Sequence, residues 1–295
     1  MSVEASRSCD PSSGMGGYRL LDVGDGRKLE QFGEYILDRP APAAESLSKT
    51  DPGAWSQAAA RYERSEGETG QWLSRLPLPE KWPVALCGLT VEVKPTPFGH
   101  VGLFPEQASN WLWIDEQMRK ANRPIRILNM FAYTGGSTLA AARAGAEMVH
   151  VDSARGTVEW ARRNALLSGL AAATVRWITE DAMKFTSREL KRGNDYDAVI
   201  LDPPSYGHGP AGEPWKIDEH LPQLLRLCAE LTAKGRLFVL LTCHSPGYGP
   251  KELGSLTRDA FGGSGAAIEA RELALESAAG TQLRCGAMAR WTRSE

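Results

Sequence analysis

The chain has 295 residues, a net charge of −2, 42% hydrophobic and 24% charged residues. This length accommodates one large or two ordinary globular domains. The near-neutral charge argues against strong non-specific binding to nucleic acid, and no apolar run reaches the roughly 18 residues of a membrane span.

The cysteines and the amino terminus exclude further classes. The chain has 5 cysteines, an odd number, without a C-x-x-C pair, so we expect reduced thiols and neither a disulfide framework nor a metal site. The first residues lack the apolar core of a signal peptide, which predicts a cytoplasmic protein. Two clusters of basic residues, at 119–126 and 188–192, are interpreted as solvated helix ends.

The amino-terminal third shows strand and turn signals. Residues 1–17 are rich in Ser and Gly and lack periodicity, which predicts a disordered tail. The Asp-Gly pair at 25–26 lies between two apolar runs, a hairpin signal. Residues 52–64 indicate a short helix, and residues 84–93 one or two strands. We therefore predict a small β-rich domain at residues 18–97.

Strand and helix patterns alternate over residues 98–295, after a glycine-rich connector and a helix that begins near Pro105. This alternation predicts a mostly parallel sheet with right-handed crossovers. We expect an α/β Rossmann-like domain of about seven strands, with helices on both faces and a closing hairpin. The predicted strands are residues 125–130, 146–152, 174–179, 196–202, 235–243, 266–273 and 281–291.

The strand at 125–130 leads into a glycine turn, F-A-Y-T-G-G at residues 131–136. Ligands of doubly wound sheets bind beyond the carboxyl end of such a strand. The turn lacks the G-x-G-x-x-G pattern that holds a dinucleotide pyrophosphate. Asp152 ends the next strand about 16 residues after Gly136, near the spacing of about 20 for a ribose-binding carboxylate. This combination favours a nucleoside without phosphates, such as S-adenosylmethionine, over NAD.

Acidic residues end the following strands as well. Asp181 follows the third strand, where it either contributes to the site or caps a helix. Asp202 begins the motif D-P-P-S-Y at residues 202–206. Its prolines fix the backbone and remove two amide donors. Asp202 can accept a hydrogen bond from an exocyclic amine and Tyr206 can stack on a flat base, as a pocket for an extruded nucleobase requires.

Cys243 ends the fifth strand and precedes His244. A buried cysteine is usually a small hydrophobic residue. A thiolate here would alternatively attack carbon 6 of a pyrimidine and make carbon 5 nucleophilic. His244 is next in sequence and would point to the opposite face of a strand, so we do not assign it as the base. The sequence leaves both roles of Cys243 open.

These motifs resemble those of S-adenosylmethionine-dependent methyltransferases of the 23S ribosomal RNA cytosine-5 type. The resemblance rests on residues 102–107, 129–136, 202–206 and 242–244. It implies a class I methyltransferase fold, S-adenosylmethionine as cofactor and Cys243 at the family's nucleophile position, with Asp202 as its catalytic partner. The residues it implies at the cofactor are Phe131, Ala132, Tyr133, Thr134, Gly135, Asp152, Ser153, Asp181, Ala182 and Asp202, and those at the target base are Pro203, Pro204 and Tyr206.

The leading hypothesis is therefore methylation of cytosine carbon 5 in ribosomal RNA through a covalent cysteine intermediate. Two alternatives stay open. One is an N-methyltransferase that acts on a purine exocyclic amine, a small molecule or a protein. The other is a non-catalytic S-adenosylmethionine-binding factor for ribosome assembly. Family members often carry an amino-terminal PUA domain, whose pattern residues 18–93 do not show. The sequence does not identify the target nucleotide. It also leaves the oligomeric state open, with a dimer as one option.

Overall fold

The structure is a computed structural model that describes residues 17–65, 69–263 and 265–293. The chain packs into two compact units. The first runs to Ala108 and includes Ala274–Cys285, and the second contains Ser109–Leu273 and Gly286–Glu295. The predicted disordered tail lies outside the described residues except for Gly17, which forms a β-bridge with Ala85. The predicted division into domains at residue 97 stays a proposal.

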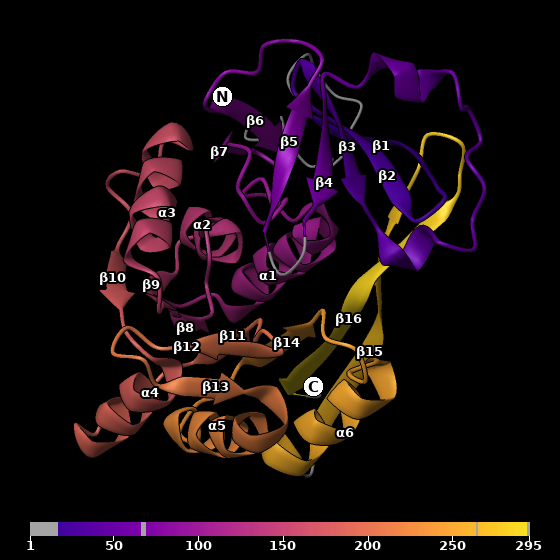
Figure 1. Cartoon of the computed structure of the whole chain (residues 1–295). Coiled ribbons are helices and arrows are strands. Elements are labelled where there is room, and N and C mark those ends of the chain that lie inside the picture. Colours follow the sequence, from indigo (N-terminus) through magenta and orange to yellow (C-terminus); the bar gives the residue numbers. More distant parts are fainter. Residues whose placement is uncertain (1–16, 66–68, 264, 294–295) are drawn as a thin grey trace. The chain divides into compact units, whose positions relative to one another are not determined.

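The first unit is rich in β structure, as predicted (Figure 1). Asp25 and Gly26 have positive φ angles of 53° and 70° and form the predicted hairpin turn. The apolar run after this turn is divided at Gly33 (φ 64°) into two strands. The unit has a five-stranded sheet of β1 (Tyr18–Gly24), β2 (Arg27–Phe32), β3 (Tyr35–Pro40), β4 (Ala60–Arg64) and β5 (Gly70–Ser74). A separate hairpin consists of β6 (Trp82–Leu86) and β7 (Leu89–Val93).

Two predictions for this unit are wrong. Residues 52–64 do not form one helix: a 3₁₀ turn, η2 (Ala54–Gln57), precedes strand β4. Ala60 and Tyr62 are buried and alternate with more exposed neighbours, so pairing with β3 and β5 overrides the local helical pattern. Cys87 is disulfide-bonded, contrary to the expectation of reduced thiols.

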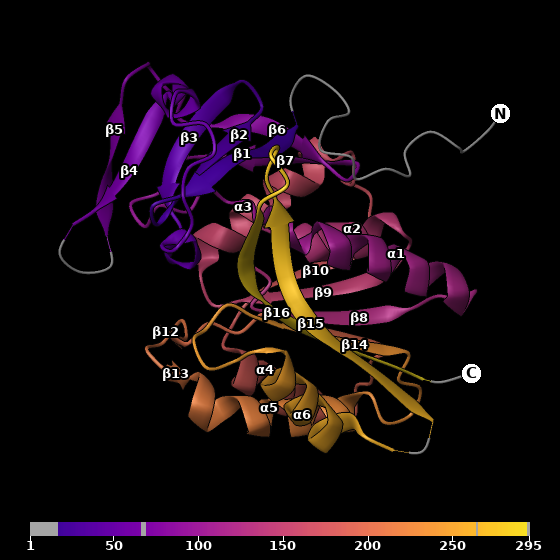
Figure 2. The same cartoon turned by 90° about the vertical axis from the view of Figure 1, so that its right-hand side faces the viewer.

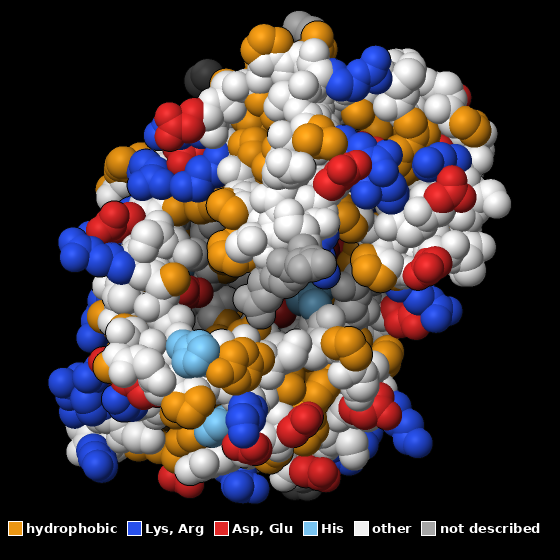
Figure 3. Space-filling model, viewed as in Figure 1, with side chains coloured by type: hydrophobic (Ala, Val, Ile, Leu, Met, Phe, Trp, Pro, Cys, Tyr) orange, Lys and Arg blue, Asp and Glu red, His pale blue; other side chains and the backbone are white. Residues whose placement is uncertain are grey.

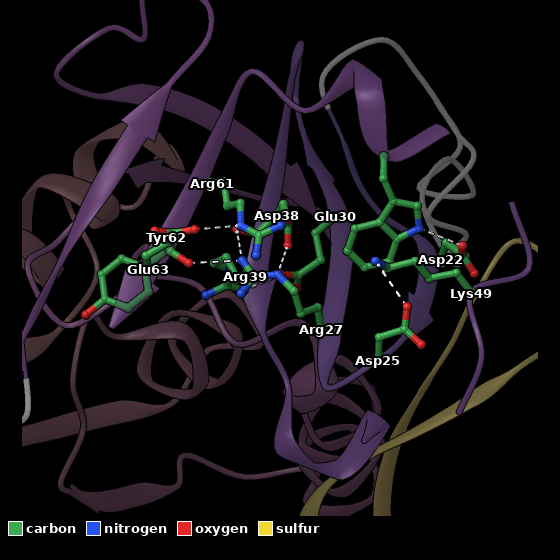
Figure 4. Close-up of polar contacts among 11 residues, drawn as sticks. Asp22, Asp25, Arg27, Glu30, Asp38, Arg39, Lys49, Arg61, Tyr62 and Glu63 are labelled. Carbon is green, nitrogen blue, oxygen red and sulfur yellow. Dashed lines mark hydrogen bonds and ion pairs between the residues drawn. The ribbon is translucent and has the colours of Figure 1, made fainter. Parts of the chain in front are cut away.

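Charged side chains of this first unit form ion pairs and hydrogen bonds, some of them buried (Figure 4). The fully buried Glu30 carboxylate accepts from the Tyr18 hydroxyl at 3.0 Å and pairs with Arg39 at 2.6 Å. Asp22 accepts four N–H donors, among them the Trp55 indole at 2.8 Å. Every one of these carboxylates has partners, as buried charges require. Within the described part of the chain, no group of acidic, His or Cys residues is arranged to hold a metal ion.

The second unit contains the predicted seven-stranded sheet, in the order β10-β9-β8-β11-β14-β16-β15. The first five strands run parallel and β16 is antiparallel to β14. The strands are β8 (Arg126–Met130), β9 (Glu147–Asp152), β10 (Val175–Thr179), β11 (Ala198–Leu201), β14 (Phe238–Cys243), β15 (Ala266–Glu276) and β16 (Gln282–Arg293). The sequence did not predict the small hairpin of β12 (Tyr206–His208) and β13 (Pro214–Lys216).

Helices cover both faces of this sheet (Figures 1 and 2). One face carries α1 (Ala108–Ala121, after the 3₁₀ turn η3, Pro105–Gln107), α2 (Gly136–Arg143) and α3 (Arg155–Leu167), and the other carries α4 (Ala182–Lys191), α5 (Ile217–Leu231) and α6 (Pro250–Phe261). The strand pleat sends alternate side chains to the two faces. Val199 and Leu201 of β11 pack in the core with α4 to α6, whereas Ile200 packs in the core with α1 and α2. None of the described helices is long and apolar enough to cross a membrane.

Candidate active site

The turn between β8 and α2 is held in an unusual backbone conformation by Asp152. Phe131, Tyr133 and Gly135 have positive φ angles of 55°, 49° and 91°. One carboxylate oxygen of Asp152, at the end of β9, accepts from the Tyr133 amide at 2.9 Å. The other accepts from the Ala154 amide at 3.0 Å. Burial raises the pKa of the Asp152 carboxyl above its usual range, although both amides oppose this.

Gly135 and Gly136 are required by packing as well as by conformation. Gly135 is the residue before α2 and has the left-handed conformation that favours glycine. A Cβ on Gly136 would lie 2.5 Å from Cζ2 of Trp111, whose indole donates to Ser137 at 3.2 Å. The absence of a side chain at Gly136 therefore lets α2 pack against α1, a role that the sequence motif alone did not reveal.

We expect Gly136→Ala to destabilise the protein by about 1–3 kcal/mol, because the methyl group overpacks the contact with Trp111. Gly156→Ala is the matched control, since Gly156 lies in α3 with no atom within 4 Å of an added Cβ. It should leave stability unchanged or raise it by about 0.5–1 kcal/mol through helix propensity. Thermal unfolding of the two variants measures the difference, and equal stability would contradict the packing argument.

A buried polar chain lies under the turn. The Asn129 amide donates to the Thr138 hydroxyl at 2.8 Å, and that hydroxyl is 2.9 Å from Nδ1 of His150. Asn164 donates to the carbonyl of Thr134 at 2.9 Å. Burial lowers the pKa of His150 to about 3, so its imidazole is neutral. The sequence signal for these buried hydrogen bonds was a polar residue within an otherwise apolar strand, Asn129 in β8 and His150 in β9. The sequence-based prediction did not use this signal.

Asp181 makes the contact expected of a helix cap. Its carboxylate accepts from the Lys184 amide at 2.8 Å at the start of α4. This is the alternative that the sequence left open, and a place for Asp181 or Ala182 near an adenine stays a prediction. Ala182 is buried and Ser153, next to Asp152, is half-buried.

Asp202 follows β11 and lies beside the end of β14. Its Oδ1 accepts from the Thr242 hydroxyl at 2.7 Å and lies 3.6 Å from Nε2 of His244. Burial alone would raise the pKa of the Asp202 carboxyl, but His244 and Thr242 outweigh it and hold that pKa below its usual range. Asp202 is therefore an ionised, partly accessible carboxylate that Thr242 and His244 contact at Oδ1. The sequence-based prediction left His244 without a role, although its position two residues after Thr242 on the same side of the strand was the available signal for this contact.

The D-P-P-S segment is anchored through its carbonyl groups. The Trp215 indole donates to the Pro204 carbonyl at 2.7 Å, and the Ile217 amide donates to the Ser205 carbonyl at 3.0 Å. The Tyr206 side chain is 54% exposed, and its hydroxyl lies 3.0 Å from Nε2 of His208. Tyr206 is thus accessible for stacking, and contact of Pro203, Pro204 and Tyr206 with a target base stays a prediction.

Cys243 points away from Asp202. It belongs to the core with α4 to α6, on the opposite side of the pleat from Thr242, and is only 1% exposed. Its Sγ accepts from the Ser245 amide at 3.4 Å and lies 4.0 Å from the Pro203 carbonyl. Burial raises the pKa of the thiol, the Ser245 contacts oppose this, and the charge on Asp202 adds to the increase. The thiol is therefore neither exposed nor ionised.

The two basic clusters are ion-paired, as expected of solvated helix ends. Arg119 and Lys120 pair with acids one helical turn earlier in α1, at 3.3 and 2.7 Å. Arg123 pairs with Asp197 at 2.6 Å and Arg188 with Glu180 at 2.7 Å. On the face shown in Figure 3, Lys and Arg side chains are interspersed with Asp and Glu.

Comparisons with known proteins agree with this architecture. Residues 42–262 match the model of a family described as S-adenosylmethionine-dependent methyltransferase. A solved structure titled as a SAM-dependent methyltransferase from Agrobacterium tumefaciens is 38% identical, with a TM-score of 0.90 over 95% of this chain and 92% of that one.

Curated relatives are similar over shorter stretches. Ribosomal RNA large subunit methyltransferase I of Aeromonas salmonicida is 33% identical over 115 residues, which are 38% of this chain and 28% of that protein. The Escherichia coli protein of the same name is 25% identical over 214 residues, 65% of this chain and 52% of that protein. The matched segments thus span about half or less of these relatives.

Proposed function

This chain belongs to the S-adenosylmethionine-dependent methyltransferase family, and on that premise we propose that it methylates an exocyclic amine of a nucleobase in RNA. When bound, S-adenosylmethionine supplies an activated methyl group. The turn at residues 131–136 and the Asp152 carboxylate fit a nucleoside without phosphates, because the turn offers main-chain groups and an acid but no pyrophosphate pattern.

The observation that carries the proposal is the ionised carboxylate of Asp202. An amine N–H of the acceptor donates to Asp202, which fixes the nitrogen and aims its lone pair. As the nitrogen–carbon bond forms and the carbon–sulfur bond breaks, positive charge develops on the nitrogen. The nearby carboxylate stabilises that charge electrostatically. The surplus proton then leaves the nitrogen through this hydrogen bond and passes to water.

The cytosine carbon 5 hypothesis receives less support from the geometry. It requires the Cys243 thiolate to attack carbon 6, but the thiol is buried in the core with α4 to α6 and its pKa is raised. A reactive cysteine is normally exposed and beside a cation. The covalent role of Cys243 requires an accessible, deprotonated thiol, and both its burial and its raised pKa oppose this.

RNA as the substrate is supported by the names of the curated relatives, which are ribosomal RNA methyltransferases. The exposed Tyr206, which belongs to the same D-P-P-S-Y motif as Asp202, adds a side chain able to stack, a sequence-tolerant way to hold an unpaired base. Arg119, Lys120 and Arg123 of the first basic cluster are engaged by neighbouring acids. We therefore expect recognition of one exposed nucleotide in folded RNA rather than binding along a duplex.

The test is methylation of total RNA from a strain that lacks the gene, with purified protein and labelled S-adenosylmethionine. Mass analysis of the nucleosides should show an N-methylated base. Cys243→Ala should retain the wild-type rate within about threefold, because no covalent step is required. The appearance of 5-methylcytidine, with an inactive Cys243→Ala and a trapped 5-fluorocytosine adduct, would establish the covalent route instead. Cofactor binding without transfer to any RNA would favour a non-catalytic assembly factor.

A further inference from the structure

Trp215 touches both sides of the site. It lies on β13, between the D-P-P-S segment and α5. Its indole N–H donates to the Pro204 carbonyl at 2.7 Å. Its ring centroid is 4.7 Å from that of Phe131, in the turn assigned to the cofactor, with the planes inclined by 56°. The side chain is 3% exposed. One rigid group therefore joins the cofactor turn to the acceptor segment.

The chemistry of the acceptor segment explains why an indole is suited to this position. Pro203 and Pro204 have no amide N–H, so the backbone of these two residues can be anchored only through its carbonyl groups. In such a hydrogen bond the backbone carbonyl is the hydrogen-bond acceptor. The hydrogen-bond donor must then be a side chain, here one that also fills an apolar space. Tryptophan combines a large apolar ring with one N–H donor. A stacked contact with His220, at 5.5 Å and 27°, supports the ring further.

We propose that Trp215 is a positioning residue that sets the distance between the methyl donor at residues 131–136 and the acceptor at Asp202. The inference deepens the proposed function and rests on it for the identity of the acceptor. Transfer rates depend steeply on the separation of the reacting atoms, and a displacement of about 1 Å can cost about 100-fold. A side chain that links the two holding segments directly controls this separation.

The kinetic test uses Trp215→Phe, which removes the N–H donor and keeps an aromatic ring against Phe131. We expect kcat to fall by about 10-fold or more, because the Pro204 segment loses the one anchor that ties it to the ring packed against Phe131. The dissociation constant of S-adenosylmethionine should stay within about threefold, since the cofactor turn retains its aromatic contact. The control is Trp291→Phe, which alters a buried indole of the same core whose N–H has no partner among the described residues. It should lower stability and leave kcat unchanged.

A second measurement does not depend on the acceptor. In the wild-type protein, binding of S-adenosylhomocysteine should slow amide hydrogen exchange at residues 131–136 and also at residues 205–208, because Trp215 connects the two segments. In Trp215→Phe the protection should be confined to residues 131–136. If that variant does not fold, as thermal unfolding would show, Phe131→Leu breaks the same link from the other side and should show the same uncoupling.

The outcomes separate the two proposals. Absence of transfer to any RNA by the wild-type protein would refute the proposed function, whereas the exchange experiment would still decide the role of Trp215. Protection at residues 205–208 that persists in Trp215→Phe, or a kcat equal to that of the wild-type protein, would overturn the positioning role. Equal losses of kcat in Trp215→Phe and Trp291→Phe would show that the indole only contributes to core stability.

Discussion

Asp202→Ala is expected to lower kcat by about 100-fold or more, the range found when a preorganised electrostatic partner of a transition state is removed. The carboxylate is ionised and held by Thr242 at 2.7 Å and by His244 at 3.6 Å, so its charge is already in place before the acceptor binds. Asp202→Asn keeps the shape but removes the charge, and we expect a loss of similar size. The measurement is steady-state transfer, with calorimetry to verify that cofactor binding is retained.

The matched control for Asp202 is Asp195→Asn. Asp195 lies before β11, its side chain is 55% exposed, and it pairs only loosely with Lys234 at 3.4 Å. Surface pairs of this kind contribute about 0–1 kcal/mol, so activity and stability should both be retained. Wild-type kcat in Asp202→Asn would exclude a charged role for this residue and, with it, the amine mechanism.

Asp152→Ala is expected to weaken S-adenosylmethionine binding by about 100-fold, which corresponds to about 2.7 kcal/mol. The variant loses the carboxylate that we predict to bind a ribose, and with it the two acceptor oxygens that hold the Tyr133 and Ala154 amides. Hydrogen bonds to a charged group contribute about 1.5–3 kcal/mol each, and Tyr133 also has a left-handed conformation that costs free energy without support. Calorimetry with S-adenosylhomocysteine measures the affinity directly.

Glu147→Gln serves as the control for Asp152, because Glu147 begins the same strand and is exposed at the opposite end. We expect unchanged cofactor affinity in this variant. The cofactor affinity of Asp152→Asn should lie between those of Asp152→Ala and Glu147→Gln, since an amide retains one acceptor oxygen. Unaltered affinity in Asp152→Ala would show that this carboxylate neither contacts the cofactor nor shapes the turn.

The second unit was predictable because its pattern is local. Buried parallel strands are continuous apolar runs, and amphipathic helices follow them at helical spacing. The glycine turn and the acids at strand ends could also be located, because they directly follow these runs. Prediction failed at residues 52–64, where pairing with β3 and β5 turned a helix-like segment into strand β4. It also missed the β12–β13 hairpin that carries Trp215.

What the sequence by itself determined is the alternation of strands and helices, the glycine turn at residues 131–136 and the placement of Asp152 and Asp202 at strand ends. It also determined that Cys243 and His244 point in opposite directions, since neighbours on a strand alternate. Only the tertiary structure decided which of these two side chains, Cys243 or His244, points toward Asp202. Leu201 pairs with Leu241, which places Asp202 beside Thr242 and within reach of His244 and leaves Cys243 in the core. That register depends on contacts between residues about 40 positions apart, which local periodicity does not encode.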